Sequence, residues 1–511
     1  MFIPSPQQQR FFDWVATGSG HAILEAVAGA GKTTTLIQAL HRMQGSVWLG
    51  VFNKKLADEI VGRLSSEDDP FGTSHQVHAS TFHSAGFTRL RRTGKVRVDN
   101  DKCKTIAKAL IEEREGIDQL QNRRLRVATS LALRLVSLGK NRLLTPGSPD
   151  TDWLDIIEHH NMQLPDGVTP DLLIDFAWRI LTRSQEWRSV IDFDDMIYRP
   201  VVERIGGRQY DWVLIDEAQD TNPARRELAA MLLKPSGRFI AVGDPRQAIY
   251  GFTGADNDAL DQLRSKYQAV TLPLSITFRC PRQVVDHARS FGATLEVAPD
   301  AREGSVTSMT EEDMIEYLRD TTEAERANSA LVCRVTKHLV RLCYGFIRQG
   351  IPARVEGRSI GEGLLKLATR WKVSDLSDLS ERVEDYRARE LAKAQEQEND
   401  ALAERIADQT DTLQLLIDLT TSRGGHHLSD LRSLIEEMFS DGVTDQKMLT
   451  LCTVHRAKGL EWSNVYLLGR AQLMPSPWAE REWAVDQEWN LVYVAITRAL
   501  DRLIEVTLDK P

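Results

Sequence analysis

Cysteine is scarce in this chain, and its positions are not paired. The spacing of the five cysteines fits neither a disulfide framework nor a cysteine-based metal cluster, and favours reduced, mostly buried thiols in a cytosolic protein. No run of about 18 apolar residues occurs, so no membrane-spanning helix is expected. The first residues also lack the basic-then-apolar layout of a signal peptide. The cysteines are Cys103, Cys280, Cys333, Cys343 and Cys452.

An excess of basic charge is also missing. The net charge of −9 does not indicate a nucleic-acid binder, so any such binding needs a local basic patch on an acidic body. Basic residues do gather between Arg89 and Arg142. Two readings stay open for them: a solvated helical face interleaved with acids, or a surface that contacts a phosphate backbone. The chain length predicts about three or four domains.

A phosphate-binding loop is the strongest motif. The segment AVAGAGKT, residues 26–33, lies between an apolar run at Ala22–Leu24 and a stretch with helical spacing. Its small residues let backbone N–H groups approach phosphate oxygens at a helix N-terminus. Lys32 is expected to reach the β- and γ-phosphates of a nucleotide, and the Thr33 hydroxyl to bind Mg²⁺. The cradle residues are Ala28, Gly29, Ala30 and Gly31.

Two later segments supply polar groups at the ends of buried strands. The apolar run 212–215 leads directly into Asp216 and Glu217, as a buried parallel strand ending at its carboxyl edge would. Asp216 is suited to hold Mg²⁺, and Glu217 to orient and deprotonate the attacking water. After a further strand at 239–242, Gln247 is placed to sense a γ-phosphate.

Aromatic residues and amides near predicted strand ends form the second candidate group. Gln8 precedes the loop and could pair with an adenine edge. The segment ASTFHSAGF, residues 79–87, reads as a short extended piece. Phe52 and His83 would lie at strand ends, where open α/β sheets carry ligand sites. Tyr250 and Phe252 are spaced to present rings from a loop, as a stacking platform for bases requires.

The remaining pattern alternates strands and helices and predicts an α/β fold. Residues 150–191 keep a helical pattern and read as a helical insertion, with Trp153, Trp178 and Trp187 filling its core. A second sheet domain is expected from near Leu272. Charged residues dominate 371–440, which favours a long solvated helical hairpin. Strands are expected at 448–454 and 464–469, then a helix over 489–503 and a last strand.

In order, these motifs resemble the UvrD/Rep-like branch of superfamily 1 helicases over essentially the whole chain. The motif sequences DEAQD, FRCP and HRAKGLEW look most similar to those of the Fbh1-like sub-branch. The ordered motifs are SPQQ, AVAGAGKT, VFNKKLADEI, TFHS, IDFDD, LIDEAQD, VGDPRQAIYGF, TFRCP, TVHRAKGLEW and YVAITRA.

The resemblance implies two RecA-like parallel-sheet lobes with ATP between them. It also implies that Thr34 belongs to the nucleotide-binding residues, that Phe278 stacks on adenine, and that Glu461 contacts the ribose. Arg279 and Arg498 would act as arginine fingers on the γ-phosphate. The positions implied to contact single-stranded DNA are Phe52, Thr81, His83, Tyr250, Phe252 and His455.

The implied activity is that of an ATP- and Mg²⁺-dependent 3′→5′ DNA helicase or single-stranded DNA translocase. Its partners would be single-stranded DNA and single-strand/duplex junctions, without a membrane, in the cytoplasm or on the nucleoid. Two alternatives remain: a translocase that displaces proteins without processive unwinding, and a non-catalytic DNA-binding scaffold. The expected division is 1–86 with 185–269 (first lobe), 87–184 (helical insertion), 270–370 with 441–511 (second lobe), and 371–440 (short charged insertion).

Overall fold

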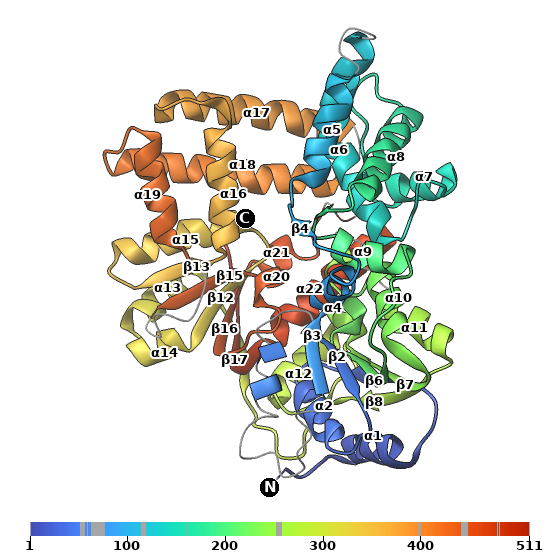
Figure 1. Ribbon diagram of the computed structural model, residues 1–511. Coiled ribbons are helices and arrows are strands. Elements are labelled where there is room, and N and C mark those ends of the chain that lie inside the picture. Colours follow the sequence, from blue (N-terminus) through green and yellow to red (C-terminus); the bar gives the residue numbers. More distant parts are fainter. Residues whose placement is uncertain are drawn as a thin grey trace. The chain divides into compact units, whose positions relative to one another are not determined.

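The computed structural model describes residues 2–51, 57–58, 60–62, 77–113, 119–160, 162–251, 258–396, 400–440, 448–477, 479 and 481–509. The chain forms two compact units (Figure 1). The first contains residues 1–26 and 31–274, and the second contains residues 27–30 and 275–511. Within the described residues, no helix combines the length and apolar character needed to cross a membrane.

The first unit is built on a parallel sheet. Among the described residues its strand order is β3-β2-β6-β7-β1-β8, and every pair is parallel. The apolar runs form these strands because both faces of a parallel sheet are buried. The strands are β1 (Ala22–Ala26), β2 (Val47–Val51), β3 (Val77–Thr81), β6 (Tyr210–Ile215), β7 (Leu233–Gly243) and β8 (Val270–Leu274). The helices of the first unit outside the predicted insertion include α1 (Pro6–Thr17), α2 (Lys32–Leu40), α4 (Phe82–Leu90), α9 (Asp195–Val202), α10 (Pro223–Leu232) and α11 (Ala259–Tyr267).

The predicted helical insertion forms a group of helices within the first unit (Figure 1). Its two ends meet, because β4 (Arg97–Val98) pairs in parallel with β5 (Val190–Ile191). Trp153 is buried in its core, as predicted, but Trp178 and Trp187 are 39% and 36% exposed. That part of the prediction was wrong, because apolar size alone does not show which side of a helix faces the core. The helices are α5 (Lys102–Glu112), α6 (Gln119–Asn141), α7 (Asp150–His159) and α8 (Pro170–Glu186).

The second unit holds a second parallel sheet. Its order among the described residues is β11-β17-β16-β12-β15-β13-β14, again parallel throughout. The α/β fold with two parallel-sheet domains is therefore confirmed. The strands are β11 (Ser305–Thr310), β12 (Ser329–Cys333), β13 (Ala353–Glu356), β14 (Phe439–Ser440), β15 (Leu449–Thr453), β16 (Trp462–Leu468) and β17 (Ala499–Thr507), with β9 (Ile276–Thr277) pairing β10 (Glu296–Val297). The helices outside the charged segment are α12 (Arg282–Ser290), α13 (Glu311–Asp320), α14 (Glu323–Ala327), α15 (Thr336–Arg348), α16 (Arg358–Ala368), α20 (Val454–Ala457), α21 (Arg470–Leu473) and α22 (Glu482–Ile496).

Three predicted boundaries differ from the structure. The second unit begins at Ser275 rather than at 270, because β8 pairs with β1 and completes the first sheet. The TFHS segment is strand only as far as Thr81, where the Thr81 side chain caps α4 by accepting from the Ser84 N–H. The last helix ends at Ile496 and β17 begins at Ala499, so the predicted helix over 489–503 runs too far. The finer division into four segments stays a prediction.

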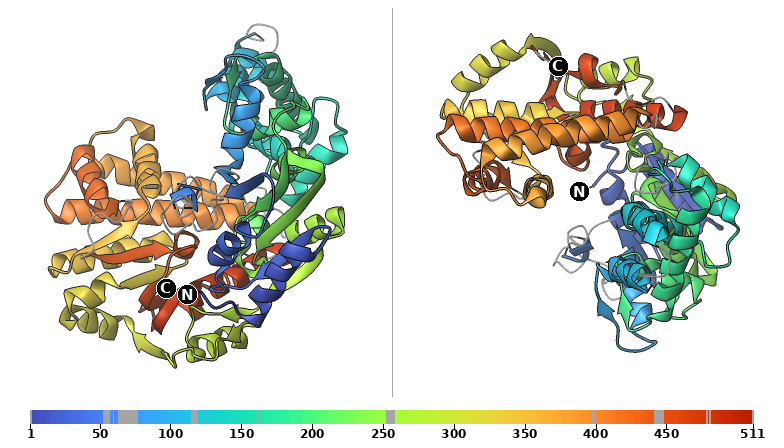
Figure 2. Two further views of the ribbon diagram at one scale, coloured as in Figure 1. Left: turned by 60° about the horizontal axis from the view of Figure 1, so that its bottom comes forward. Right: turned by 90° about the horizontal axis from the view of Figure 1, so that it is seen from above.

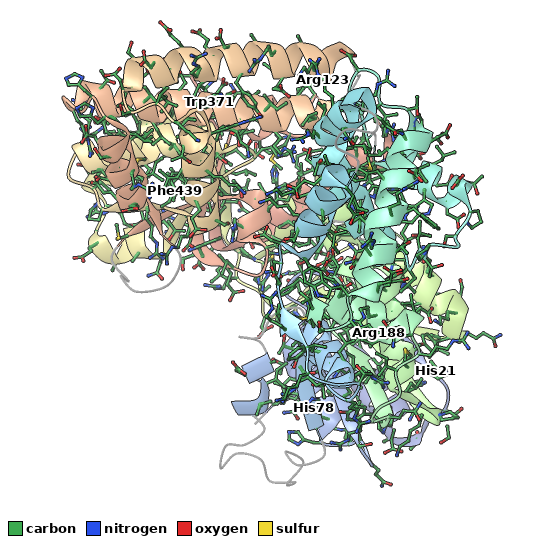
Figure 3. The ribbon with its side chains drawn as sticks, turned by 45° about the horizontal axis from the view of Figure 1, so that its top comes forward. His21, His78, Arg123, Arg188, Trp371 and Phe439 are labelled. Atoms are coloured by element: carbon green, nitrogen blue, oxygen red, sulfur yellow. The ribbon has the colours of Figure 1, made fainter. Side chains whose placement is uncertain are left out.

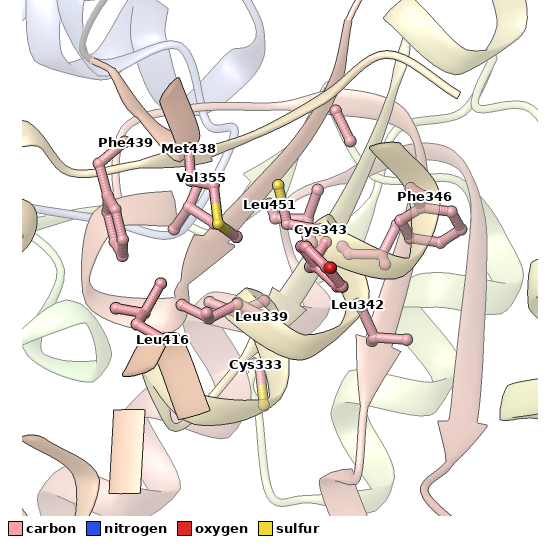
Figure 4. Close-up of a cluster of buried hydrophobic side chains, with 14 of the residues drawn as sticks. Cys333, Leu339, Leu342, Cys343, Phe346, Val355, Leu416, Met438, Phe439 and Leu451 are labelled. Atoms are coloured by element: carbon pink, nitrogen blue, oxygen red, sulfur yellow. The ribbon is translucent and has the colours of Figure 1, made fainter. Parts of the chain in front are cut away.

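The charged segment folds as three helices that share the core of the second unit. The helices α17 (Leu376–Glu396) and α18 (Asp400–Ser422) lie side by side in the views of Figures 1 and 2, followed by α19 (Leu428–Met438). Figure 4 shows Leu416 of α18 and Met438 of α19 in one apolar cluster with Leu339 of α15 and Leu451 of β15. The hairpin is therefore packed against the sheet domain rather than solvated on all sides.

One carboxylate fastens α18 to the start of α15. The residue before α15 is Val335, which has no polar side chain to cap the helix. Instead, Asp408 Oδ1 accepts the N–H groups of Thr336 and Lys337 at 2.9 and 3.0 Å. Asp408 thus satisfies, from another helix, two of the donors that every helix N-terminus leaves open.

We expect Asp408→Ala to destabilise the second unit by about 0.5–2 kcal/mol, because the two N–H groups lose their acceptor. Asp418→Ala is the matched control, since Asp418 lies on the same helix with an exposed side chain. Urea unfolding measures both changes. Equal effects of the two substitutions would show that the cap contributes nothing of its own.

Candidate active site and nucleic-acid surface

The glycine-rich loop has the backbone that a phosphate cradle requires. β1 ends at Ala26, and α2 begins at Lys32. Gly29 and Gly31 have φ values of 74° and 75°, in the left-handed region where a side chain is strained. A Cβ on Gly29 would lie 2.4 Å from Arg279 Cβ, so this position admits only glycine. Thr33 and Thr34 lie in the first turn of α2, where Thr33 is half-buried and Thr34 is exposed.

Residues 27–30 belong by their contacts to the second unit, and several predicted residues meet there. The Phe278 N–H donates to Gly29 O at 2.9 Å, and the Phe278 side chain is 52% exposed. Arg279 forms a 2.6 Å ion pair with Glu461, the residue expected at the ribose. The Ala28 N–H donates to the Tyr493 hydroxyl at 3.0 Å. Tyr493 carried no predicted role, although it stands in the motif YVAITRA.

Lys32 and Glu217 are brought together in the first unit. Lys32 Nζ lies 3.2 Å from Glu217 Oε1. Glu217 follows the end of β6 with φ 50°, a left-handed conformation that turns the chain sharply after Asp216. The Gln219 amide donates to Glu217 Oε2 at 2.5 Å and fixes this carboxylate from a second side. A lysine and a candidate general base, taken from two separate motifs, thus lie next to one another.

The same site carries perturbed carboxylate and ammonium groups. Burial, followed by the neighbouring Glu217 carboxylate, raises the pKa of Asp216 to about 7. Burial alone would lower the pKa of Lys32, but the charges of Glu217, Asp244 and Asp216 outweigh it and raise that pKa. An anionic pocket of this kind favours a cation beside Asp216.

A hydrogen-bonded chain joins the ends of β6 and β7. Gln219 Oε1 accepts the Asp244 N–H at 3.1 Å, and Asp244 Oδ2 accepts from the Gln247 amide at 2.7 Å. Gln247, the predicted γ-phosphate sensor, is therefore linked to Glu217 through two residues that carried no predicted role. Both lie inside the motifs LIDEAQD and VGDPRQAIYGF, so position within a motif was the available signal.

Two predicted nucleotide-site residues are held by protein partners. Gln8 is buried; its amide donates to Thr35 Oγ1 at 2.9 Å, and its carbonyl accepts the Ser5 N–H. Arg498 is 1% exposed, and its guanidinium donates to the carbonyl oxygens of Val494 and Leu460. Both side chains are therefore held by hydrogen bonds within the protein.

An aromatic pair marks the candidate nucleic-acid surface of the first unit. His83, in the first turn of α4, lies 4.5 Å from Phe193 between ring centroids, at an interplanar angle of 50°. Phe193 is 51% exposed and carried no predicted role, although it is the only aromatic residue of the motif IDFDD. The two rings line a pocket of about 380 Å³. Its polar lining includes Arg134, Ser137, Asn141, Asp194, Asp220, Asn222 and Arg225.

The other predicted nucleic-acid residues are spread over both units. Thr81 ends β3, directly before α4, and Tyr250 is half-buried after β7. His455 lies in α20 of the second unit, where burial and nearby cations lower its pKa to about 3. Phe52 and Phe252 lie outside the described residues.

The basic stretch divides into buried and exposed members. Arg89 is 4% exposed and donates to the carbonyl oxygens of Ile205, Arg208 and Met231, so it supports the fold. Lys140 is likewise buried. Arg123, labelled in Figure 3, is exposed on α6. The other exposed members include Arg91, Arg92, Lys95, Arg97, Arg124, Arg126 and Arg134.

His83 should make the first unit less stable in mild acid. Burial, and then Arg225, lower its pKa in the fold from 6.5 to about 4. Between these values the unfolded chain binds the extra proton, so stability present above pH 6.5 falls as the pH approaches 4. We expect His83→Gln to lose less stability than the wild type between about pH 7.5 and about pH 5 in urea unfolding. An equal loss of stability in the wild type and the variant would show that His83 is not the group responsible.

Comparisons with known proteins agree with this arrangement. The UvrD/REP helicase N-terminal domain matches residues 6–268, and the UvrD-like helicase C-terminal domain matches residues 304–509. The ATP-dependent DNA helicase PcrA of Leuconostoc citreum is 26% identical over 69% of this chain. UvrD2 of Mycobacterium tuberculosis, also described as an ATP-dependent DNA helicase, is 25% identical over 96% of it. The putative ATP-dependent DNA helicase YjcD of Bacillus subtilis is 22% identical over 96%.

These relatives are longer than the matched part. The aligned region spans 47% of the PcrA relative and 77% of the UvrD2 and YjcD relatives. The two family domains nevertheless follow one another in the order of the two sheet units, and the first covers more than half of the chain. With its phosphate loop, its Asp-Glu strand end and both family domains in place, this chain belongs to the UvrD/Rep helicase family.

Proposed function

We propose that this protein is an ATP-dependent DNA translocase and helicase that moves 3′→5′ along single-stranded DNA. The observation that carries the proposal is the ion pair of Lys32 with Glu217, next to the buried carboxylate of Asp216. Such a site serves nucleotide hydrolysis, and family membership connects it with DNA. The direction of movement rests on the resemblance alone.

In the proposed reaction, the γ-phosphate of ATP takes the place of Glu217 beside Lys32. Glu217, still held by Gln219, is then placed to accept a proton from the attacking water. Gln247 would sense the γ-phosphate, and Arg279 and Arg498 would neutralise the charge that develops there. Gln8, Thr34, Phe278 and Glu461 are proposed to hold the adenosine.

The residues present suit Mg²⁺. Thr33 and Asp216 offer the hydroxyl and carboxylate oxygens that this ion prefers. A buried carboxylate with a pKa of about 7 also gains from a nearby divalent cation. Bound there, Mg²⁺ would neutralise phosphate charge and orient the nucleotide.

Single-stranded DNA is the proposed partner of the aromatic pair. Phe193 and His83 offer ring faces beside a pocket with arginine and asparagine groups, which suits a base and its phosphate. Thr81, Tyr250 and His455, together with Phe52 and Phe252, are also proposed to contact single-stranded DNA. The exposed arginines of α6 would contact phosphates near a single-strand/duplex junction.

Two assays test the proposal. ATP turnover should rise when single-stranded DNA is added, and rise more than with single-stranded RNA of the same sequence. Duplexes with a 3′ single-stranded tail should be unwound, and duplexes with a 5′ tail should not. A lack of DNA stimulation would refute the proposal. Stimulation without unwinding, with displacement of a protein bound to the strand, would favour the translocase alternative.

A further inference from the structure

Two lysines from the helical insertion are buried among aspartates of the IDFDD segment. Lys102 of α5 and Lys140 of α6 are 0% and 1% exposed. Lys102 Nζ lies 2.6 Å from Asp195 Oδ2. Lys140 Nζ lies 2.6 Å from Asp192 Oδ2 and 2.9 Å from Asp195 Oδ1. Burying charges is costly unless they are paired, so the four groups must remain together.

The same aspartates clamp the backbone around Phe193. Asp192 Oδ1 accepts the Asp195 N–H at 2.8 Å, and Asp195 Oδ2 accepts the Asp192 N–H at 3.2 Å. These reciprocal bonds close a short turn with Phe193 inside it. Asp194 is held separately by the Ser137 hydroxyl of α6 at 2.6 Å. Every residue that flanks Phe193 is therefore fixed.

The turn reverses the usual preference for burial. Asp192 and Asp195 are 8% and 1% exposed, whereas Phe193 is 51% exposed. A charged pair normally faces water and a phenyl ring the core. Here the lysines hold the aspartates inside, and the ring projects beside His83 at the pocket. Burial alone would lower the pKa of Lys140, but Asp195 and Asp192 hold it well above its usual value, so its charge persists.

We infer that Lys102, Lys140, Asp192 and Asp195 are positioning residues, which fix the Phe193 ring for stacking on a base of single-stranded DNA. The inference rests on the proposed function. It gives the helical insertion a role in gripping DNA through the lysines of α5 and α6, although neither lysine is exposed to contact DNA itself. An ordinary structural ion network would not affect Phe193 in particular, and this difference can be measured.

The test is a double-mutant cycle on DNA affinity. A fluorescein-labelled oligothymidylate is titrated with the full chain, and binding is followed by anisotropy. Phe193→Ala should weaken binding about 5- to 100-fold, as loss of one base-stacking contact does. Lys140→Met combined with Asp192→Asn removes one pair without leaving an unpaired charge, and should weaken binding similarly. Adding Phe193→Ala to that double variant should weaken DNA binding by less than a further twofold, because the ring is already misplaced.

Several controls separate the outcomes. Arg179→Met with Asp175→Asn removes an exposed ion pair on α8 and should leave affinity unchanged. Thermal melting shows whether each variant folds. If the variant that combines Lys140→Met with Asp192→Asn does not fold, Asp192→Asn alone takes its place in the cycle. Fully additive losses, or no loss with Phe193→Ala, would overturn the inference while leaving the proposed helicase and translocase activity intact. No binding by the wild type would refute both.

Discussion

Glu217→Gln should lower DNA-stimulated ATP turnover by on the order of 10²- to 10⁴-fold, because the amide cannot accept the proton of the attacking water. The fold should persist, since Gln219 can still hydrogen-bond the remaining carbonyl oxygen. Steady-state turnover at saturating DNA measures the effect. The turn at Glu217 has φ 50°, which glutamine tolerates as glutamate does, so backbone strain does not confound the comparison.

Glu186→Gln is the matched control for this prediction. Glu186 is exposed at the end of α8, so the same chemical change there should leave turnover unaffected. Lys32→Ala should reproduce the loss by a different route, since it removes the positive charge expected at the γ-phosphate. Turnover close to the wild-type rate in both site variants, with intact folding, would mean that hydrolysis occurs elsewhere.

Lys102→Met should destabilise the first unit by about 3–5 kcal/mol, which is the range for removing one partner from a buried ion pair. The change leaves the buried Asp195 carboxylate without one of its two lysines, and it leaves the Ser184 carbonyl without the 2.7 Å bond from Lys102 Nζ. Urea unfolding of the first unit measures the loss. Of the predicted substitutions, this one should have the largest effect on stability.

Lys104→Met, two residues along the same helix, provides the comparison. Its ammonium lies 3.6 Å from Asp101, and its side chain is 71% exposed, so the change should cost less than about 0.5 kcal/mol. A similar small cost at Lys102 would show that the buried network contributes little. It would also weaken the argument that the network fixes Phe193.

Much of the candidate nucleotide site could be predicted, because its main chemical groups lie in short segments of the sequence. The loop at 26–33 and the pair Asp216–Glu217 each follow a buried strand. Since all strands of the sheet are parallel, their carboxyl ends share one edge. The partners of these groups are less local. Gln219 bonds to the nearby Glu217, but the bonds of Asp244 to Gln219 and of Tyr493 to Ala28 form only once distant segments meet. A motif therefore showed the position of these residues but not their contacts.

Other features could not be read from the sequence for reasons of burial. From the sequence alone, the aspartates of IDFDD are expected to be exposed and the phenylalanine buried. The structure has the opposite arrangement, because Lys102 and Lys140, far away in sequence, pair with the buried aspartates. The charged helices α17 and α18 have too few apolar residues to indicate a packed face, yet Leu416 joins the core of the second unit. The end of the first sheet was misjudged because β8 pairs with β1, far away in sequence.

The pairing of β4 with β5 has a consequence for how this architecture could arise. Arg97 lies opposite Val190, so the helical segment leaves and re-enters the α/β domain at a single point. Such a segment can be gained, enlarged or exchanged by genetic insertion without rethreading the sheet. The exchange has one condition. An incoming segment must bring two cations to Asp192 and Asp195, or the recipient domain keeps two buried anions that it cannot accommodate.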